Sequence, residues 1–423
     1  MNRRRVVVTG LGVVAPGGVG ADAFWSLLSE GRTATRRLSL FDPGPYRSQV
    51  AAEVDFDPYA NGLRPPEVRR MDRAAQFAVV STRQAVADSG IDLARTDPYR
   101  VAVAYGSAVG GSIGLESEYR VLSDDGQLDL VDHRYAAPHL YNYVVPSSFV
   151  QEVANDVGAQ GPGSLVSTGC TSGIDVLGYA AQLIRDGSAD VVVTGAADAP
   201  ITPITSACFD AVKATSVHND SPETASRPYD RSRNGFVLGE GGAGLVLEEY
   251  ESAKRRGARI YAEIGGYATY ANAFHMTGLK ADGAEMAAAI TAALGEARVN
   301  ADQVDYVNAH GTATKQNDVH ETAAFKHALG DHAYRTPVSS IKSMIGHSLG
   351  AIGSIEAVAC LLAMQNDVVP PTANLHEQDP ALDLDYVPLT ARDRRTDVVV
   401  CVGSGFGGFQ SALVLHEPGR AAA

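Results

Sequence analysis

Cysteine is scarce in this sequence, and the cysteines that occur are far apart. There are four in 423 residues, and no two form a C-x-x-C pair. This spacing excludes the common zinc and redox motifs, and a chain of this length needs no disulfide framework to stabilise its core. We therefore expect a reducing, cytoplasmic setting.

Positive charge and long apolar runs are also in short supply. Lys and Arg total 35 against 49 Asp and Glu, a net charge of −14, which argues against a nucleic-acid-binding protein. Acids such as Asp198 and Glu356 interrupt the apolar runs, so no membrane-spanning segment is predicted. The start, Met1–Arg5 followed by Val6–Val8, resembles a signal peptide, but Gly10 soon ends the apolar run and a β-strand is the better interpretation.

The pattern that is present is that of an α/β protein, because short β-branched runs alternate with longer helical stretches. The content of 45% hydrophobic and 20% charged residues is ordinary for a globular chain. Strands are predicted at Arg5–Gly10, Val101–Tyr105, Leu165–Thr168, Val191–Thr194, Gly244–Glu248, Val304–Asn308 and Val398–Val402. Helices are predicted at Pro66–Ser89, Thr171–Asp186, Gly283–Ala297, Val319–Leu329 and Leu349–Asn366.

A short motif occurs twice and indicates internal duplication. Gly169–Gly173 and Gly346–Gly350 each precede a predicted helix, 177 residues apart, and each half also ends with a strand running into small residues. The charged stretch Glu251–Arg259 has the composition of a connector. These features predict two similar α/β halves, residues 1–253 and residues 260–418.

Two further motifs point to other functions. Gly10–Ala15 matches the GxGxxA dinucleotide fingerprint, but Pro16 stands where the pyrophosphate-binding helix would run, so a tight strand-to-loop turn is the better interpretation. Gly346–Gly350 is a literal GxSxG, typical of the α/β-hydrolase nucleophile, here Ser348. Only 75 residues follow Ser348 to supply the rest of a hydrolase site.

Cys170 is the best candidate nucleophile. It lies between a predicted strand and a predicted helix, where free backbone N–H groups and the helix dipole would lower the thiol pKa and bind an oxyanion. Cys208, Cys360 and Cys401 lie in apolar surroundings and are interpreted as buried structural residues.

Two glycine-flanked histidines form a constellation with Cys170. His310 and His347 are each predicted to lie at the end of a strand, where α/β sheets build their sites. No carboxylate stands at HxxxE spacing from either histidine on one clear helical face, so no metal site is predicted.

Four ordered stretches resemble the β-ketoacyl synthase family, and the resemblance runs from Val6 to Leu415. The stretches are Ser167–Gly173, Asn308–Thr312, Ser340–His347 and the glycine-rich Gly403–Gly408. Gly195–Ile204 and Lys315–Asp318 are similar to the ketosynthase α-subunits of type II polyketide synthases in particular. The resemblance implies an α/β, thiolase-like fold with a duplicated five-layer α-β-α-β-α core.

The resemblance implies decarboxylative condensation of a malonyl thioester with an acyl chain. Cys170 would carry the acyl chain, and its backbone N–H would form an oxyanion hole with that of Phe406. His310 and His347 would hold the malonyl thioester oxygen while CO2 leaves. No metal or organic cofactor is implied, because the substrates are carried on the phosphopantetheine of an acyl carrier protein.

Supporting roles are implied for five further residues. Lys342 would order the site together with Glu321, and Asp318 would belong to the same network. Thr312 and Thr314 would hydrogen-bond the pantetheine arm.

Two partners are implied by the resemblance, the acyl carrier protein and a chain-length factor that would form a heterodimer with this chain. Carrier proteins of the family are acidic, so docking needs a local positive surface. The candidate docking residues are Arg64, Arg69, Arg70 and Arg73, at the start of a predicted helix.

Three alternatives stay open. Gly311–Thr314 reads as in fatty-acid elongating synthases, which leaves the product open between an aromatic chain, a reduced polyene and a fatty acid. A non-catalytic chain-length factor shares the fold but lacks the nucleophile, so the presence of Cys170 argues against it. A hydrolase would need Ser348 and not Cys170.

Overall fold

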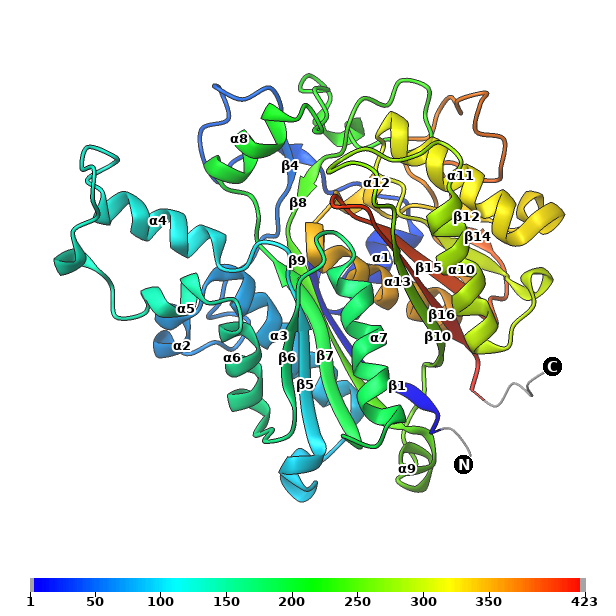
Figure 1. Ribbon diagram of the computed structural model, residues 1–423, viewed down its shortest axis with the longest axis horizontal. Helices are drawn as coiled ribbons and strands as arrows, with labels where there is room; N and C mark the ends of the chain where they lie inside the picture. Colours follow the sequence, from blue (N-terminus) through cyan, green and yellow to red (C-terminus); the bar gives the residue numbers. More distant parts are fainter. Residues whose placement is uncertain (1–3, 419–423) are drawn as a thin grey trace.

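The structure is a computed structural model that describes residues 4–418 (Figure 1). Its centre is an 11-stranded mixed sheet in the order β12-β11-β15-β16-β10-β1-β9-β7-β5-β6, with β2 paired to β1 off this path. The strands are β1 (Val6–Ala15), β2 (Gly18–Val19), β5 (Val101–Gly106), β6 (Gly163–Val166), β7 (Val191–Asp198), β9 (Gly241–Glu249), β10 (Ala262–Ala271), β11 (Tyr306–Asn308), β12 (Val338–Ser339), β15 (Val398–Ser404) and β16 (Phe409–His416).

The two halves of this sheet repeat one topology. The first set of strands contains β1, β5, β6, β7 and β9, and the second contains β10, β11, β12, β15 and β16. When the strands of each set are numbered from one to five in chain order, they lie side by side in the order 3-2-4-5-1 in both sets. In both sets the second strand is parallel to the third and fourth, whereas the fifth is antiparallel to the fourth and first. The two sets join where Val7 and Val8 of β1 pair with Glu263 and Ala262 of β10.

Helices form three layers around the two sets of strands (Figure 1). One outer layer packs on the first set, a central pair lies between the sets, and the other outer layer packs on the second set. These layers are α3 (Arg73–Ser89) with α6 (Ser148–Val157), α7 (Ser172–Arg185) with α13 (Ile352–Asn366), and α10 (Ala284–Ala297) with α11 (Lys315–Leu329). The duplicated five-layer arrangement expected from the family resemblance is confirmed.

The central pair approaches closely because glycines face each other across it. A Cβ at Gly173 of α7 would lie 2.5 Å from the backbone nitrogen of Ser354, and one at Gly353 would lie 2.7 Å from that of Ile174. The Ser354 hydroxyl donates to the Gly173 carbonyl at 2.8 Å. This contact fixes the starts of α7 and α13 relative to each other, which is where the candidate site lies.

The remaining elements surround this core. A small sheet contains β3 (Arg36–Arg37), β4 (Val50–Ala52) and β8 (Leu238–Gly239), and a ribbon contains β13 (Val368–Val369) and β14 (Arg392–Asp393). The other α-helices are α1 (Ala21–Ser29), α2 (Pro65–Arg70), α4 (Ser112–Leu122), α5 (Leu140–Val144), α8 (Pro203–Ala211), α9 (Tyr250–Arg255) and α12 (Lys342–Ile345). In Figure 1, α4 and α5 project from one side of the sheet.

Two local predictions were wrong. The helix predicted at Pro66–Ser89 is broken into α2 and α3, because the Asp72 side chain accepts the Ala74 N–H and caps α3. Gly10–Ala15 is not a turn but the second part of β1, and the short strand β2 follows it where the pyrophosphate-binding helix would stand. Its glycines admit α3, since a Cβ at Gly10 would lie 2.1 Å from the Ala85 carbonyl oxygen.

One apolar segment differs from the prediction that no stretch of the chain has the character of a membrane span. Leu349–Asn366 is long and apolar enough to cross a membrane by length and composition, although it contains Glu356. It includes α13, and 83% of it is buried inside the fold. A core helix enclosed by two sets of strands has this composition for the same reason as a membrane span, because apolar surroundings meet it on every side.

Candidate active site

Cys170 stands one residue before the N-cap of α7. Gly169, in the left-handed region at φ 61°, turns the chain between β6 and the helix, and Thr171 is the N-cap. The backbone N–H groups of Phe406 and of Cys170 itself both act on the Cys170 thiol and lower its pKa. Burial nevertheless raises the thiol pKa to about 11, against the lowering effect of these N–H groups and of Lys342. The lowered pKa expected from the helix dipole is therefore wrong for the unliganded site.

The two histidines meet edge to face. The ring centroids of His310 and His347 lie 5.2 Å apart with an interplanar angle of 85°, and His347 makes a similar edge contact with Phe236 at 5.4 Å. Both residues are 3% exposed, and the Nδ1 atom of each has no hydrogen-bond partner among the described residues. Burial and the Lys342 charge hold both imidazole pKa values well below the usual range. Both rings are therefore neutral at neutral pH.

The local setting of His347 differs from the prediction. His310 follows β11, as expected, but His347 follows the short helix α12 and not a strand. Its backbone N–H donates to the Val237 carbonyl at 2.8 Å, and its carbonyl accepts the Gly239 N–H at 2.9 Å. The strand-like segment that holds His347 is therefore β8, from the other half of the chain.

A cavity of about 470 Å³ brings the predicted residues together. Cys170, His310, His347, Thr312, Thr314 and Phe406 all line it. The two threonine hydroxyls lie 3.0 Å apart, and Thr314 also caps α11 by accepting the Asn317 N–H. The remaining lining residues are Phe209, Val212, Lys213, Ala214, Asn234, Gly235, Phe236, Thr277, Leu279, Lys315, Gln316, Asn317, Leu349, Ser404 and Gly405.

Lys342 pairs with a residue that the sequence did not single out for this role. Its ammonium group donates to Glu356 of α13, and both side chains are fully enclosed. Burial raises the pKa of Glu356 to about 7, although Lys342 acts in the opposite direction. The ion-pair partner of Lys342 is therefore Glu356, while Glu321, which was expected to order the site together with Lys342, feels the Lys342 charge without pairing with it. A signal was present in the sequence, because Glu356 is the one carboxylate in an otherwise apolar helix.

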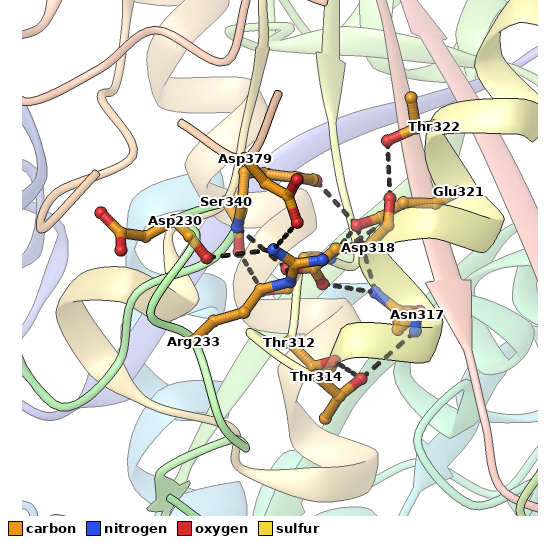
Figure 2. Close-up of polar contacts among 12 residues, drawn as sticks. Asp230, Arg233, Thr312, Thr314, Asn317, Asp318, Glu321, Thr322, Ser340 and Asp379 are labelled. Atoms are coloured by element: carbon orange, nitrogen blue, oxygen red, sulfur yellow. Dashed lines mark hydrogen bonds and ion pairs between the residues drawn. The ribbon is translucent and has the colours of Figure 1, made fainter. Parts of the chain in front are cut away.

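Glu321 and Asp318 belong to a separate buried network on α11 (Figure 2). Glu321 accepts hydrogen bonds from the Tyr229 hydroxyl at 2.7 Å and from the Gly311 N–H at 2.9 Å, next to His310. Asp318 pairs with Arg233 at 3.2 Å and accepts the Tyr229 N–H at 2.9 Å. Burial, with the Asp318 charge, raises the Glu321 pKa to about 8, and burial raises that of Asp318 to about 6. Tyr229 and Arg233 were missed, since nothing in their local sequence marks them as buried.

The four candidate docking arginines are not equally available. Arg70 makes a bidentate pair with Glu152, and Arg73 makes one with the fully buried Glu240. The Arg64 side chain is 76% exposed and pairs with Glu67. Arg69 is exposed and its guanidinium has no ion pair among residues 4–418. A cluster of four free guanidinium groups is therefore not present.

Ser348 lacks the environment of a hydrolase nucleophile. Its side chain is 2% exposed, and its hydroxyl has no hydrogen-bond partner among the described residues, so no histidine is positioned to activate it. Within residues 4–418, no group of three or more His, Cys, Asp or Glu side chains is arranged to hold a metal ion. Of the other cysteines, Cys360 and Cys401 are buried as expected, but Cys208 on α8 is exposed.

Comparison with known families accounts for this arrangement. Residues 3–253 match the β-ketoacyl synthase N-terminal domain, and residues 261–376 match the C-terminal domain of the same family. The chain belongs to the β-ketoacyl synthase family. It is 69% identical over 420 residues to a putative polyketide β-ketoacyl synthase 1 from Streptomyces virginiae, covering 99% of both chains. It is 41% identical over 422 residues to a 3-oxoacyl-[acyl-carrier-protein] synthase 2 from Coxiella burnetii, again covering 99% of both.

Solved structures of β-ketoacyl synthases share the fold. The AntDE:AntF complex, a type II polyketide synthase acyl-carrier protein with its ketosynthase bound to the hexaketide, has a chain with a TM-score of 0.92 and 36% identity, covering 98% of this chain and 100% of that one. The ishigamide ketosynthase/chain length factor gives a TM-score of 0.89 and 33% identity, covering 99% and 100%. The fold is therefore thiolase-like, as expected, and the chain is an enzyme of the carbon–carbon bond-forming acyltransferase type.

Proposed function

We propose that this chain is the ketosynthase α-subunit of a type II polyketide synthase, which condenses malonyl-carrier protein with an acyl chain held on Cys170. The observation that carries the proposal is the convergence of one thiol, two neutral imidazoles and two backbone N–H groups on one cavity. The identity of 69% to a putative polyketide β-ketoacyl synthase 1, against 41% to a 3-oxoacyl-[acyl-carrier-protein] synthase 2, favours the polyketide class.

In the first half-reaction, the Cys170 sulfur attacks the thioester carbonyl of the incoming acyl chain. The carbonyl oxygen gains negative charge in the transition state, and the N–H groups of Phe406 and Cys170 are the donors available to it. Because burial keeps the thiol protonated, its proton must leave as the sulfur–carbon bond forms, and an imidazole in the cavity can pass it on to the departing carrier sulfur without holding the charge. The carrier leaves as a free thiol after taking up that proton.

In the second half-reaction, the bond between the malonyl carboxylate and Cα breaks, and CO2 leaves. The electron pair passes to the thioester as an enolate, whose oxygen His310 and His347 stabilise by hydrogen bonding. The enolate carbon then attacks the acyl-Cys170 carbonyl, the sulfur leaves as a thiolate, and the thiolate takes up one proton from solvent. The proximity of Lys342 favours this step, because it opposes protonation of the imidazoles and adds positive charge near the enolate.

The only prosthetic group that we propose is the phosphopantetheine arm of an acyl carrier protein, which carries the substrates. Thr312 and Thr314 would hydrogen-bond that arm along the cavity wall. A thioester already stabilises the carbanion, so the proposed reaction needs no additional cofactor. We place the enzyme in the cytoplasm, in keeping with free thiols at Cys170 and Cys208.

The partner is proposed to be a chain-length factor of the same fold. β6 is an edge strand of the sheet. In Figure 1, α4 and α5 project from the same half of the molecule, and the segment that they bound carries exposed apolar side chains. Leu130 is 84% exposed, and Tyr135 and Tyr141 are each 65% exposed. An open strand edge next to such a surface is the kind of region that a second chain covers. The ishigamide ketosynthase/chain length factor supports a heterodimer.

Two smaller proposals complete this description. The division into residues 1–253 and 260–418 is supported by the repeated strand order and by the limits of the two family matches, although residues 1–3 lie outside the described part of the chain. Of the candidate docking residues, Arg69 is proposed as the one whose charge is free to meet an acidic carrier, with Arg64 beside it.

The proposed function can be tested by mass spectrometry of the chain co-expressed with a chain-length factor. Acyl-carrier protein should add an acyl group to Cys170, and malonyl-carrier protein should then remove it and release one CO2 for each β-ketoacyl product. A Cys208→Ala control should behave as the parent does. The proposal fails if the acyl group is found elsewhere, or if malonyl-carrier protein does not discharge it. Equal activity as a homodimer without the partner would favour a fatty-acid elongating synthase.

A further inference from the structure

Two of the chain's few lysines lie at the cavity and are unpaired. The sequence contains six lysines. Lys280, Lys326 and Lys342 each pair with a carboxylate, and Lys254 lies over the Tyr250 ring. The other two, Lys213 and Lys315, are exposed, line the cavity and have no ion pair or hydrogen-bond partner within residues 4–418.

The backbone brings these two lysines to one rim. The Gly235 N–H donates to the Ala313 carbonyl at 3.1 Å, and the next N–H, of Phe236, donates to the Ala214 carbonyl at 3.1 Å. The segment around Gly235 therefore lies between the segment that contains Ala214 and the segment that contains Ala313. Lys213 immediately precedes Ala214, and Lys315 follows Ala313 by two residues. The three segments lie so close together that a Cβ at Gly235, where φ is 150°, would stand 2.5 Å from the Thr215 backbone.

The exposure of the side chains along one wall of the cavity shows the direction from the reacting groups to the solvent. His310 is 3% exposed and Thr312 is 6% exposed, Thr314 is half-buried, and Lys315 is exposed. This sequence of side chains leads from the reacting groups to the surface within five residues, a path of at most about 17 Å for extended chain. A substrate arm that lies along this wall would bring its outer end to the lysines.

We propose that Lys213 and Lys315 bind the phosphate that joins the pantetheine arm to its carrier. The inference rests on the proposed function, which supplies the arm, and adds a site for its one charged group. A lysine ammonium is a compact charge that binds phosphate through charge-assisted hydrogen bonds. In a chain of net charge −14, two unpaired cations at the mouth of an otherwise uncharged cavity attract an anion to that point. The first N–H groups of α11, which starts at Lys315, add to the attraction.

The test compares two probes that differ by one charged phosphodiester group. Pantetheine and the methyl phosphodiester of pantetheine, which has the single negative charge of the carrier-bound arm, are titrated calorimetrically into the parent protein and into Lys213→Gln, Lys315→Gln and the double variant. The parent should bind the phosphodiester more tightly. Each single change should raise its Kd about 2- to 5-fold, and the double change about tenfold. The Kd of pantetheine should not move.

The matched control is Lys254→Gln, which removes the same charge from α9, at the far end of the molecule from α8 in Figure 1. It should leave the Kd of both probes unchanged. The inference is overturned if the parent shows no preference for the phosphodiester, or if the preference survives in the double variant. It is also overturned if the lysine changes weaken binding of the whole carrier protein but not of the phosphodiester probe, because the lysines would then contact acidic groups of the carrier. Calorimetry needs no turnover, so a failure of chain extension would count against the proposed function and not against this site.

Discussion

The N-terminal and C-terminal halves of the sheet bring equivalent helices to one cavity, but they support the residues there by different means. Beside α7, the Asp175 carboxylate accepts hydrogen bonds from the hydroxyls of Thr168, Thr171, Tyr267 and Ser411. Beside α13, the support is ionic, because Lys342 pairs with Glu356. A repeated backbone thus carries two kinds of polar network.

The difference follows from what each half must supply. Backbone N–H groups that act on the Cys170 thiol need only a rigid helix start, and hydroxyl donors to the Asp175 carboxylate provide that rigidity without a buried cation. The enolate stabilisation that we propose for His310 and His347 needs neutral imidazoles, and a nearby cation keeps them neutral by holding their pKa values down. A buried lysine then requires a buried carboxylate. Duplication therefore gives the geometry, and side-chain substitution within each copy gives the chemistry.

The largest effect on stability is expected at the ion pair. Glu356→Ala leaves the Lys342 charge buried and uncompensated, which should lower the free energy of unfolding by about 3–5 kcal/mol. Urea unfolding measures this. Glu356→Gln keeps a hydrogen-bond acceptor for Lys342 and should lose less. If both variants unfold at the parent midpoint, the ionic description of the C-terminal half is wrong.

A smaller loss is expected at the corresponding site of the N-terminal half. Asp175→Asn replaces one accepting oxygen with an amide nitrogen that cannot accept. The hydroxyls that share the two oxygens in the parent therefore lose a hydrogen-bond acceptor. The expected cost is about 1–3 kcal/mol, measured in the same urea series. A loss equal to that of Glu356→Ala would remove the contrast between the two halves.

The third effect depends on pH. The Glu321 pKa is about 8 in the folded protein, above its ordinary value of 4.5. The folded state therefore binds more protons, and the stability from this group is fully present below pH 4.5 and is lost as pH rises through 8. Relative to the parent, Glu321→Gln should gain thermal stability between pH 5.5 and pH 8.5. A difference in Tm that is constant with pH would show that Glu321 does not titrate this way.

The smallest effect concerns carrier docking on the N-terminal half. Arg69→Glu should raise the KM for malonyl-carrier protein about 2- to 5-fold while leaving a small malonyl thioester unaffected, because an exposed charge contributes little. Arg255→Glu on α9 is the matched control and should change neither substrate. Equal effects of Arg69→Glu on both substrates would show that it perturbs the site and not docking.

The comparison also explains which features the sequence could predict. The alternating pattern and the repeated glycine motif were sufficient for a duplicated α/β core, since periodicity and tight turns are local properties. Cys170, His310 and His347 carry local signatures, and the structure places all three on one cavity. The partner of Lys342 was missed, because Glu356 lies on another helix and only packing brings the two together. The raised thiol pKa was missed for the same reason, since burial depends on the whole fold.

The central claim, that the N-terminal half supplies the nucleophile and the C-terminal half the enolate stabilisers, is tested most directly by measuring CO2 release and chain extension separately. Cys170→Ala should abolish extension yet still release CO2 from malonyl-carrier protein, because decarboxylation needs no acyl acceptor. His310→Ala and His347→Ala should each slow CO2 release about a hundred- to a thousand-fold, and Ser348→Ala should be close to the parent. Extension by Cys170→Ala, or decarboxylation at the parent rate by both histidine variants, would contradict the account.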